Sequence, residues 1–106
     1  MPRNYRVEIT RTAESDILKI FRYILQDNRT AAVEWIGEIE KQIDSLENFP
    51  MRCPVIPEAH ELRKEYRHLI YGNYRTIFRI EASKVIIMRV VHSAQLFDLR
   101  MFRKSK

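Results

Sequence analysis

The sequence predicts an α+β fold in which an N-terminal strand precedes an antiparallel helical hairpin packed on a mainly antiparallel sheet of about four strands. Three observations predict this class. Apolar residues alternate with polar ones at the N-terminus, they recur with the helical period over residues 13–48, and they gather in three short β-type segments over residues 66–92. At 106 residues without an internal repeat, the chain is expected to form a single domain, residues 1–106, ending in a basic tail over 93–106.

The first strand is predicted over residues 4–10, because Tyr5, Val7 and Ile9 fall on one side of an extended chain. A helix is predicted over residues 13–26, with an acidic first turn that suits the positive end of a helix. Its apolar residues recur at helical spacing: Ala13, Ile17, Ile20, Phe21 and Ile24.

A second helix follows the short polar connection at residues 27–30, and Thr30 is expected to cap it. Two helices joined this tightly are expected to lie antiparallel. Gly37 costs roughly 1 kcal/mol relative to alanine inside a helix. We attribute it to close packing against the first helix, with an exposed glycine as the alternative. The apolar stripe of this helix contains Ala32, Trp35, Ile36, Ile39, Ile43 and Leu46.

Three prolines, Pro50, Pro54 and Pro57, then predict an irregular connection. The segments after it are rich in Tyr, Ile, Val and Phe and are separated by turn residues, which predicts an antiparallel meander. Its strands are expected over residues 66–71, 74–80 and 85–92.

A two-residue turn at Gly72 and Asn73 places Tyr71 opposite Tyr74 and fixes the register of the first two meander strands. The face toward the helices is then expected to hold Tyr74, Thr76, Phe78, Ile80, Ile86, Met88 and Val90, with His92 at its end. The opposite face is expected to be open and to collect Tyr66, His68, Ile70, Arg75, Ile77, Arg79 and Arg89.

That open face is interpreted as a recognition surface, because Arg binds phosphate or carboxylate and Tyr stacks on bases or anchors peptides. A solvated sheet face whose charges prevent aggregation is the alternative. Residues 1–49 carry seven Lys/Arg and nine Asp/Glu, a net of −2, whereas residues 50–106 carry twelve and five, a net of +7. The basic half attracts phosphates, acidic protein segments or anionic surfaces without choosing among them. The tail extends it through Arg100, Arg103 and Lys104.

Several classes of site are not expected. The single cysteine, Cys53, cannot form an internal disulfide, and the three histidines lack zinc-site spacing, so we expect no metal and no cofactor. No apolar run is long enough to span a membrane, and no signal peptide is present, which predicts a cytoplasmic protein without membrane contact. A noncatalytic nucleic-acid-binding module would explain the basic half, but no recognition-helix pattern supports it.

The order of these elements is similar to the RelE/ParE superfamily of type II toxin–antitoxin toxins, over residues 4–98. Five stretches carry the resemblance: 12–17 (TAESDI), 46–50 (LENFP), 66–69 (YRHL), 74–79 (YRTIFR) and 90–92 (VVH). The resemblance implies a growth-arresting toxin of the plasmid stabilisation type, held inactive by a cognate antitoxin whose C-terminal segment wraps it.

Two mechanisms are implied by this resemblance. RelE-like members cut mRNA in the ribosome without a metal. Arg75 stands where they place a phosphate-stabilising arginine, and His92, His68 and Arg79 complete the candidate catalytic set. ParE-like members inhibit DNA gyrase, which requires a binding surface and no chemistry. The long hairpin and the Phe-Pro exit favour this branch, as does Gln95, where many relatives carry an arginine at or beside that position.

The resemblance also shapes the expected partner. We expect the antitoxin to supply an acidic or amphipathic segment that becomes ordered on the toxin. Its apolar residues are expected to cover the grooves beside the helical hairpin, and its carboxylates to meet the basic face. The expected binding face comprises Tyr66, His68, Arg75, Arg79 and Arg89, so replacing Arg75 or Arg79 by Glu is expected to weaken the complex.

Overall fold

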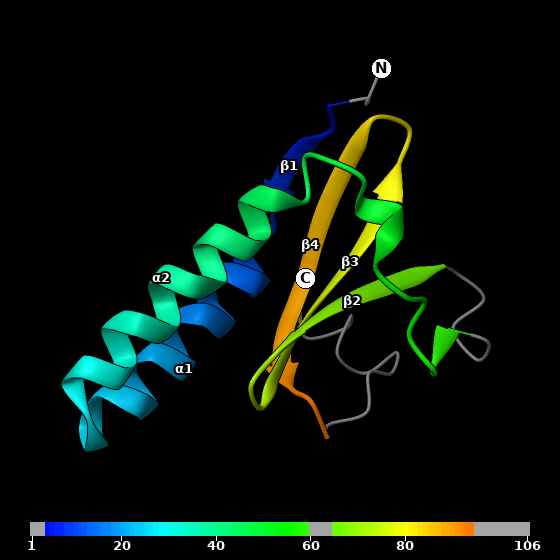
Figure 1. Ribbon diagram of the computed structural model, residues 1–106. Helices are drawn as coiled ribbons and strands as arrows, with labels where there is room; N and C mark the ends of the chain where they lie inside the picture. Colours follow the sequence, from blue (N-terminus) through cyan, green and yellow to red (C-terminus); the bar gives the residue numbers. More distant parts are fainter. Residues whose placement is uncertain (1–3, 60–64, 95–106) are drawn as a thin grey trace.

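The computed structural model describes residues 4–59 and 65–94 and contains a helical hairpin and a four-stranded sheet (Figure 1). The sheet order is β1-β4-β3-β2, in which β1 runs parallel to β4 and the other neighbours are antiparallel. The α+β class and the mainly antiparallel sheet are therefore confirmed. The elements are β1 (Arg6–Ile9), α1 (Arg11–Asp27), α2 (Arg29–Ser45), the 3-10 turn η1 (Pro50–Arg52), β2 (Tyr66–Tyr71), β3 (Tyr74–Glu81) and β4 (Lys84–His92).

Both helices are capped by side chains that precede their predicted starts. The Thr10 hydroxyl accepts a hydrogen bond from the Ala13 amide at 3.1 Å, so α1 begins two residues earlier than predicted. The Asn28 carboxamide oxygen accepts one from the Ala31 amide at 2.9 Å, so the prediction of Thr30 as the cap of α2 is wrong. The extended backbone of Asn28 ends α1 and begins α2 at the same residue, which leaves no room for a longer connection.

Gly37 lies on an exposed part of α2, where a Cβ would meet no atom of the described residues within 4 Å. The attribution to close helix packing is therefore wrong. Because alanine fits without a clash and restricts the unfolded chain, Gly37→Ala is expected to raise the free energy of unfolding by about 1 kcal/mol. Urea unfolding followed by circular dichroism measures this, and equal or lower stability would contradict it.

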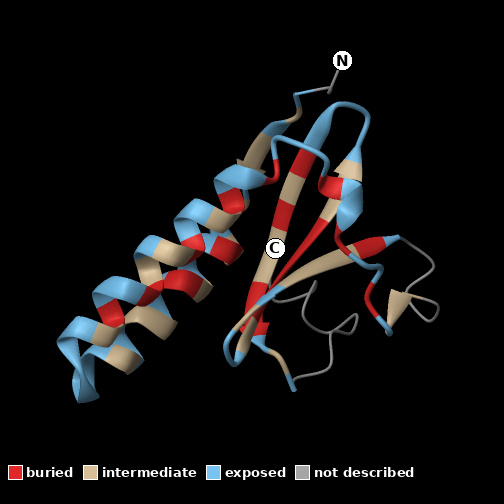
Figure 2. Cartoon of the chain, viewed as in Figure 1, coloured by how far each residue is buried: buried red, intermediate tan, exposed pale blue. Residues whose placement is uncertain are grey.

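The main hydrophobic core fills the space between the hairpin and the sheet (Figure 2). Phe78, on β3, is fully buried at its centre, and Trp35 of α2 meets Tyr74 edge to face with ring centroids 5.5 Å apart. The core continues along both helices at the spacing of three to four residues that the helical period predicted. Its buried members are Ala13, Ile17, Trp35, Ile39, Ile43, Leu46, Cys53, Phe78, Val85, Ile87 and Val90.

The register of β2 on β3 is the predicted one, from Tyr66 opposite Arg79 to Tyr71 opposite Tyr74. The turn between them contains Gly72 at a φ of 57°, a left-handed conformation that glycine adopts without strain.

The pairing of β3 with β4 is interrupted by a β-bulge. Ile77 lies opposite Arg89 and Phe78 opposite Ile87, so Met88 is an additional residue on β4. Before the bulge, Val85 and Ile87 therefore face the hairpin, and Met88 packs against the cluster on the far face. The predicted placement of Ile86 and Met88 toward the helices is wrong, because it assumed unbroken alternation along β4. Val90, beyond the bulge, faces the hairpin as predicted.

The far face of the sheet is covered beside β2 by the proline-containing connection. The Ile56 amide donates to the Tyr66 carbonyl at 2.9 Å, and the His68 amide donates to the Pro54 carbonyl at 3.2 Å. These bonds hold Ile56 against Tyr66, Ile77 and Val91 in a second buried cluster. The prediction of an open far face is therefore wrong in this region, where Tyr66 is 3% exposed and Ile77 is fully buried.

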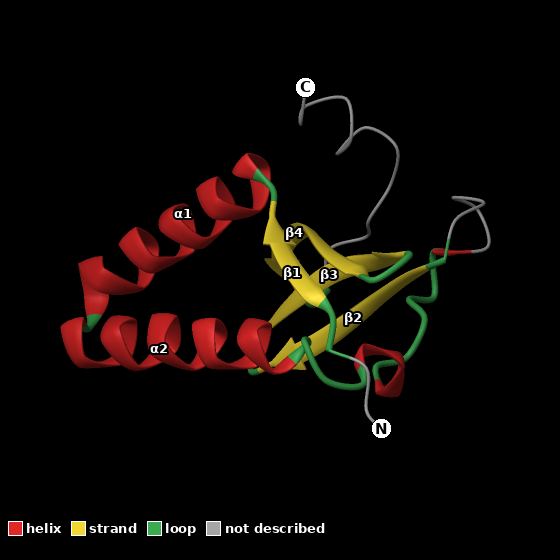
Figure 3. Ribbon diagram, turned by 90° about the horizontal axis from the view of Figure 1, so that it is seen from above, coloured by secondary structure: helices red, strands yellow, loops and turns green. Residues whose placement is uncertain are grey.

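The hairpin extends from the sheet as a pair of helices that diverge from their shared tip (Figure 3). Within residues 4–59 and 65–94, no helix is long and apolar enough to cross a membrane.

Candidate functional site

A charged cluster on the far face joins Arg75 of β3, His68 of β2 and Glu58 of the connection. Two guanidinium nitrogens of Arg75 meet the two carboxylate oxygens of Glu58, at 3.2 Å and 2.5 Å. The side chains of Arg75 and Glu58 are only 4% and 10% exposed. Arg75 is thus a buried cation held by a two-pronged ion pair from its own chain.

This pairing determines what Arg75 can do. A guanidinium binds carboxylate and phosphate through the same fork of donors. Because the Glu58 carboxylate occupies that fork and both groups are buried, a phosphate has to displace Glu58 in order to reach Arg75. Arg75 also lies below the surface rather than on it, so the expectation that it belongs to an exposed binding face is wrong.

His68 lies beside this pair, with its Nδ1 atom 3.2 Å from a terminal nitrogen of Arg75. Arginine only donates hydrogen bonds, so Nδ1 must accept and a neutral His68 carries its proton on Nε2. Burial, and then the positive charge of Arg75, lower the pKa of His68, while the Glu58 carboxylate acts in the opposite direction. The cluster therefore favours a neutral imidazole.

This lowered pKa makes stability depend on pH. The unfolded chain binds a proton at His68 at a higher pH than the folded chain does, so stability falls as pH drops below about 6.5 toward the folded pKa. His68→Gln, which cannot be protonated, is expected to flatten this part of the profile. The test is urea unfolding from pH 7.5 to 5 in about half-unit steps, with Gly37→Ala as a control that keeps His68. If His68→Gln kept the wild-type dependence of stability on pH, the assignment of this dependence to His68 would be contradicted.

Two other residues predicted for the binding face, Tyr66 of β2 and Arg79 of β3, lie opposite one another in the sheet. Arg79 pairs with Glu81 at 2.8 Å, where both side chains are partly exposed. Tyr66 is buried, and burial raises the pKa of its phenol against the opposing effect of Arg79. Tyr66 therefore contributes to the second core cluster and offers no exposed ring for stacking.

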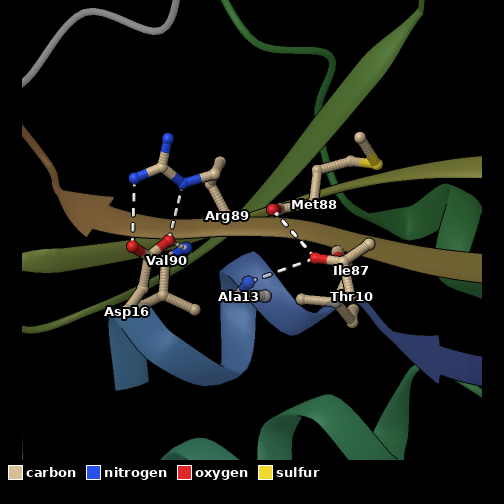
Figure 4. Close-up of polar contacts among 7 residues, drawn as sticks. All are labelled: Thr10, Ala13, Asp16, Ile87, Met88, Arg89 and Val90. Carbon is tan, nitrogen blue, oxygen red and sulfur yellow. Dashed lines mark hydrogen bonds and ion pairs between the residues drawn. The ribbon is translucent and has the colours of Figure 1, made fainter. Parts of the chain in front are cut away.

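Arg89 lies opposite Ile77 on β3, but its guanidinium is bound by Asp16 of α1 rather than lying beside the other arginines (Figure 4). Its Nε and Nη2 atoms donate to the two carboxylate oxygens of Asp16 at 2.7 Å and 3.0 Å. Asp16 also accepts the Val90 amide at 3.0 Å. The register keeps Arg89 beside Ile77, its predicted neighbour on the far face, while the guanidinium connects β4 to α1.

Beyond the end of β1, backbone groups of β4 find their hydrogen-bond partners at the start of α1. The pairing of β1 with β4 stops at Ile9 and Ile87. Beyond it, the Thr10 hydroxyl donates to the carbonyls of Ile87 and Met88 at 2.9 Å and 3.2 Å, and Asp16 takes the next amide. The first turns of α1 therefore satisfy backbone groups that a longer β1 would have paired.

His92 lies on the opposite side of the sheet from Arg75. It pairs in register with Tyr74, whose ring it meets edge to face at 5.7 Å, and its Nδ1 accepts the Ala94 amide at 3.2 Å. The prediction that His92 faces the helices agrees with this position, although the residue is exposed. His92 and Arg75 therefore do not point into one catalytic site.

The arginines of β2, β3 and β4 share one property, which is that each has a carboxylate partner in the same chain. Those of the described strands pair as Arg67–Glu65, Arg75–Glu58, Arg79–Glu81 and Arg89–Asp16. Arg67 also donates to the Cys53 carbonyl at 2.6 Å. The contacts of Arg67, Arg75 and Arg89 hold the connection and α1 against the sheet. Because all four arginines face carboxylates, the predicted basic face is largely neutralised from within.

A groove lies where the two helices diverge above the end of β1. It has a volume of about 710 Å³ and an apolar floor that includes Ile17 and Ile43. Ile9 and Leu18 at its edge are 41% and 48% exposed. The sequence periodicity places Ile9, Ile17 and Ile43 on the inner faces of their elements, but it does not include Leu18 and gives no sign that the helices separate here.

Some predicted features lie outside the described residues, namely Gln95 and the basic tail residues Arg100, Arg103 and Lys104. Across 4–59 and 65–94, no group of three or more His, Cys, Asp or Glu is placed to hold a metal ion. Sequence reasoning missed Glu58 and Asp16 as the partners of Arg75 and Arg89. Glu58 stands in an irregular segment without periodicity, and Asp16 gives only the signal of an acidic first helical turn.

Comparisons with known proteins gave matches that cover most of this chain. A family model described as the ParE toxin of the type II toxin–antitoxin system parDE matches residues 7–97. A chain of the chromosomal ParDE system from P. aeruginosa is similar in structure, with a TM-score of 0.66, 16% identity and coverage of 85% of this chain and 97% of that one. A chain of the toxin–antitoxin complex RelBE2 from Mycobacterium tuberculosis has a TM-score of 0.52 and 29% identity, covering 87% and 94%. The comparison with curated proteins gave no match.

Proposed function

This chain belongs to the ParE toxin family of type II toxin–antitoxin systems, and on that premise we propose that it arrests growth by binding and inhibiting DNA gyrase. In this proposal the toxin acts as a binding protein and carries out no reaction itself. A cognate antitoxin keeps it inactive until the antitoxin is lost.

The observation that carries this proposal is the state of Arg75. Metal-free cleavage of RNA needs cations that stabilise the charge growing on the phosphate in the transition state. Arg75 is buried and paired with Glu58, Arg79 is paired with Glu81, and His92 lies on the other side of the sheet. A chain whose candidate catalytic groups are occupied or separated is better suited to inhibition by binding than to catalysis.

The alternative is a ribosome-dependent mRNA endonuclease, and one observation favours it. His68 lies within hydrogen-bonding distance of Arg75, and its lowered pKa favours a neutral imidazole, whose Nδ1 can accept a proton once Arg75 releases it. Catalysis at this position requires the connection to move, so that Glu58 releases Arg75 and the RNA phosphate takes its place. The two candidate functions therefore differ in whether the toxin must rearrange before it acts.

Controlled expression in bacteria tests the proposal. The chain is induced from a tightly repressed promoter, and plasmid supercoiling, DNA breakage and the integrity of translated mRNA are followed as growth stops. We expect loss of supercoiling and DNA damage while mRNA remains intact. Rapid mRNA cleavage with normal plasmid topology would overturn the proposal in favour of the endonuclease.

Co-expression with the antitoxin encoded beside the toxin gene provides the matched control. It is expected to restore growth and plasmid topology together, since both effects have one cause. Restored growth with persistent loss of supercoiling would show that gyrase inhibition is not what stops growth.

A further inference from the structure

The groove between the diverging helices differs in charge from the basic half of the chain. Its rim carries Glu14 from α1, and Glu40 and Asp44 from α2, whereas no Lys or Arg among the described residues lines it. Within residues 4–59 and 65–94, none of these three carboxylates has an ion-pair partner. An apolar floor is thus bordered by uncompensated negative charge.

We propose that this groove binds an amphipathic antitoxin segment whose aliphatic side chains are flanked by Lys or Arg. The inference rests on the proposed toxin function, because it assumes that an antitoxin is the partner. It reverses the expected charge of the segment at this position. The acidic segment expected from the basic half of the sequence would bring carboxylates next to Glu14, Glu40 and Asp44.

Two features of the groove determine the chemistry of its occupant. The volume of about 710 Å³ exceeds several-fold the roughly 150 Å³ that holds one benzene molecule, so it accepts several side chains at once. The exposed edges of Ile9 and Leu18 lose contact with water when aliphatic groups cover them. Cations beside those groups then meet the carboxylate rim, which also relieves the repulsion among like charges.

The arginines of the sheet already have carboxylate partners within the chain. The groove is therefore the surface on which charge can better distinguish between partners. Arg67, Arg75, Arg79 and Arg89 each meet an acidic residue of their own chain. Complementary charge is therefore better supplied to the groove rim than to these arginines. The groove also lies on the helical hairpin, away from the Arg75 cluster, so one partner segment can fill it without disturbing the far face.

Two synthetic helical peptides of about 15 residues provide the probe. Both carry the same stripe of leucines at helical spacing, and one has Lys while the other has Glu at the flanking positions. Binding to the full chain is measured by fluorescence anisotropy at low salt. We expect the Lys peptide to bind about tenfold more tightly, because it forms ion pairs where the Glu peptide is repelled. Equal binding, or tighter binding of the Glu peptide, would overturn the inference.

A pair of charge-reversal variants locates the effect. Glu40→Lys with Asp44→Lys changes two exposed rim residues, so it is expected to abolish or reverse the preference without affecting the fold. Asp27→Lys with Glu34→Lys makes the same change in net charge away from the groove and is expected to retain it. A preference that survives in the rim variant would place the binding site elsewhere and contradict the inference.

The antitoxin itself identifies the occupant. The dissociation rate of the complex with the antitoxin encoded beside the toxin gene is expected to rise about tenfold in the rim variant and to stay unchanged in the charge control. An unchanged rate in the rim variant would exclude the antitoxin as the occupant. None of these measurements involves gyrase, so a failure of the gyrase proposal and a failure of this inference are distinguished.

Discussion

Glu58→Ala is expected to lower the free energy of unfolding by about 3–5 kcal/mol, because it leaves the Arg75 guanidinium buried without its carboxylate. Arg75 is 4% exposed and cannot recover its hydration unless the connection moves away from the sheet. A domain of this size has a total stability of only about 5–15 kcal/mol, so this single change is expected to bring the protein close to unfolding. Urea unfolding at pH 7 measures the loss.

Glu65→Ala is the matched control for this experiment. Glu65 also pairs with an arginine, Arg67, but its side chain is 58% exposed, and exposed pairs contribute less than about 1 kcal/mol. Replacing Glu58 and Arg75 together by leucine is expected to recover most of the stability, because no buried charge then remains. A loss below about 1 kcal/mol in Glu58→Ala would show that water reaches Arg75, and would contradict the buried pair.

Asp16→Ala is expected to lower the free energy of unfolding by about 2–4 kcal/mol. The change removes two charge-assisted bonds to Arg89 and the acceptor of the Val90 amide. Both charged side chains are mostly buried, at 11% and 16% exposure, so water replaces the lost partners poorly. Unfolding in urea gives the total effect, and hydrogen exchange at the Val90 amide is expected to accelerate.

Two further variants separate the contributions of Asp16. Asp16→Asn keeps an oxygen for the Val90 amide but loses the charge, so an intermediate loss of stability is expected. Glu14→Ala changes an exposed carboxylate in the same part of α1 and is expected to cost less than about 1 kcal/mol. An equal loss of stability in Glu14→Ala and Asp16→Ala would show that Asp16 acts only through its negative charge near the start of the helix.

The elements of this fold are predictable from the sequence because they depend on local patterns. The helical stripes from Ala13 to Leu46 and the turn at Gly72 each specify their structure within a few residues. The register of β2 on β3 follows from the turn alone. One local prediction is wrong, the cap of α2. Asn28 caps this helix in place of Thr30, because the extended backbone of Asn28 joins the two helices directly.

The candidate site was less predictable, since its properties depend on contacts between distant segments. The bulge at Met88 shifts the alternation of β4, so that Val85 and Ile87 face the hairpin in place of Ile86 and Met88, and strand periodicity contains no signal for it. Glu58 lies 17 positions before Arg75 in an irregular connection, so their pairing depends on how that connection covers the sheet. The sequence identified the arginines but not the carboxylates that occupy them.

The most direct test of the central claim is a gyrase supercoiling assay with the purified chain. Relaxed plasmid, gyrase and ATP are incubated with increasing amounts of toxin, with and without the antitoxin encoded beside it. We expect supercoiling to fall as the toxin is added and to recover when antitoxin is present in excess. Full gyrase activity at toxin concentrations that cleave mRNA on translating ribosomes would contradict the account and establish the endonuclease instead.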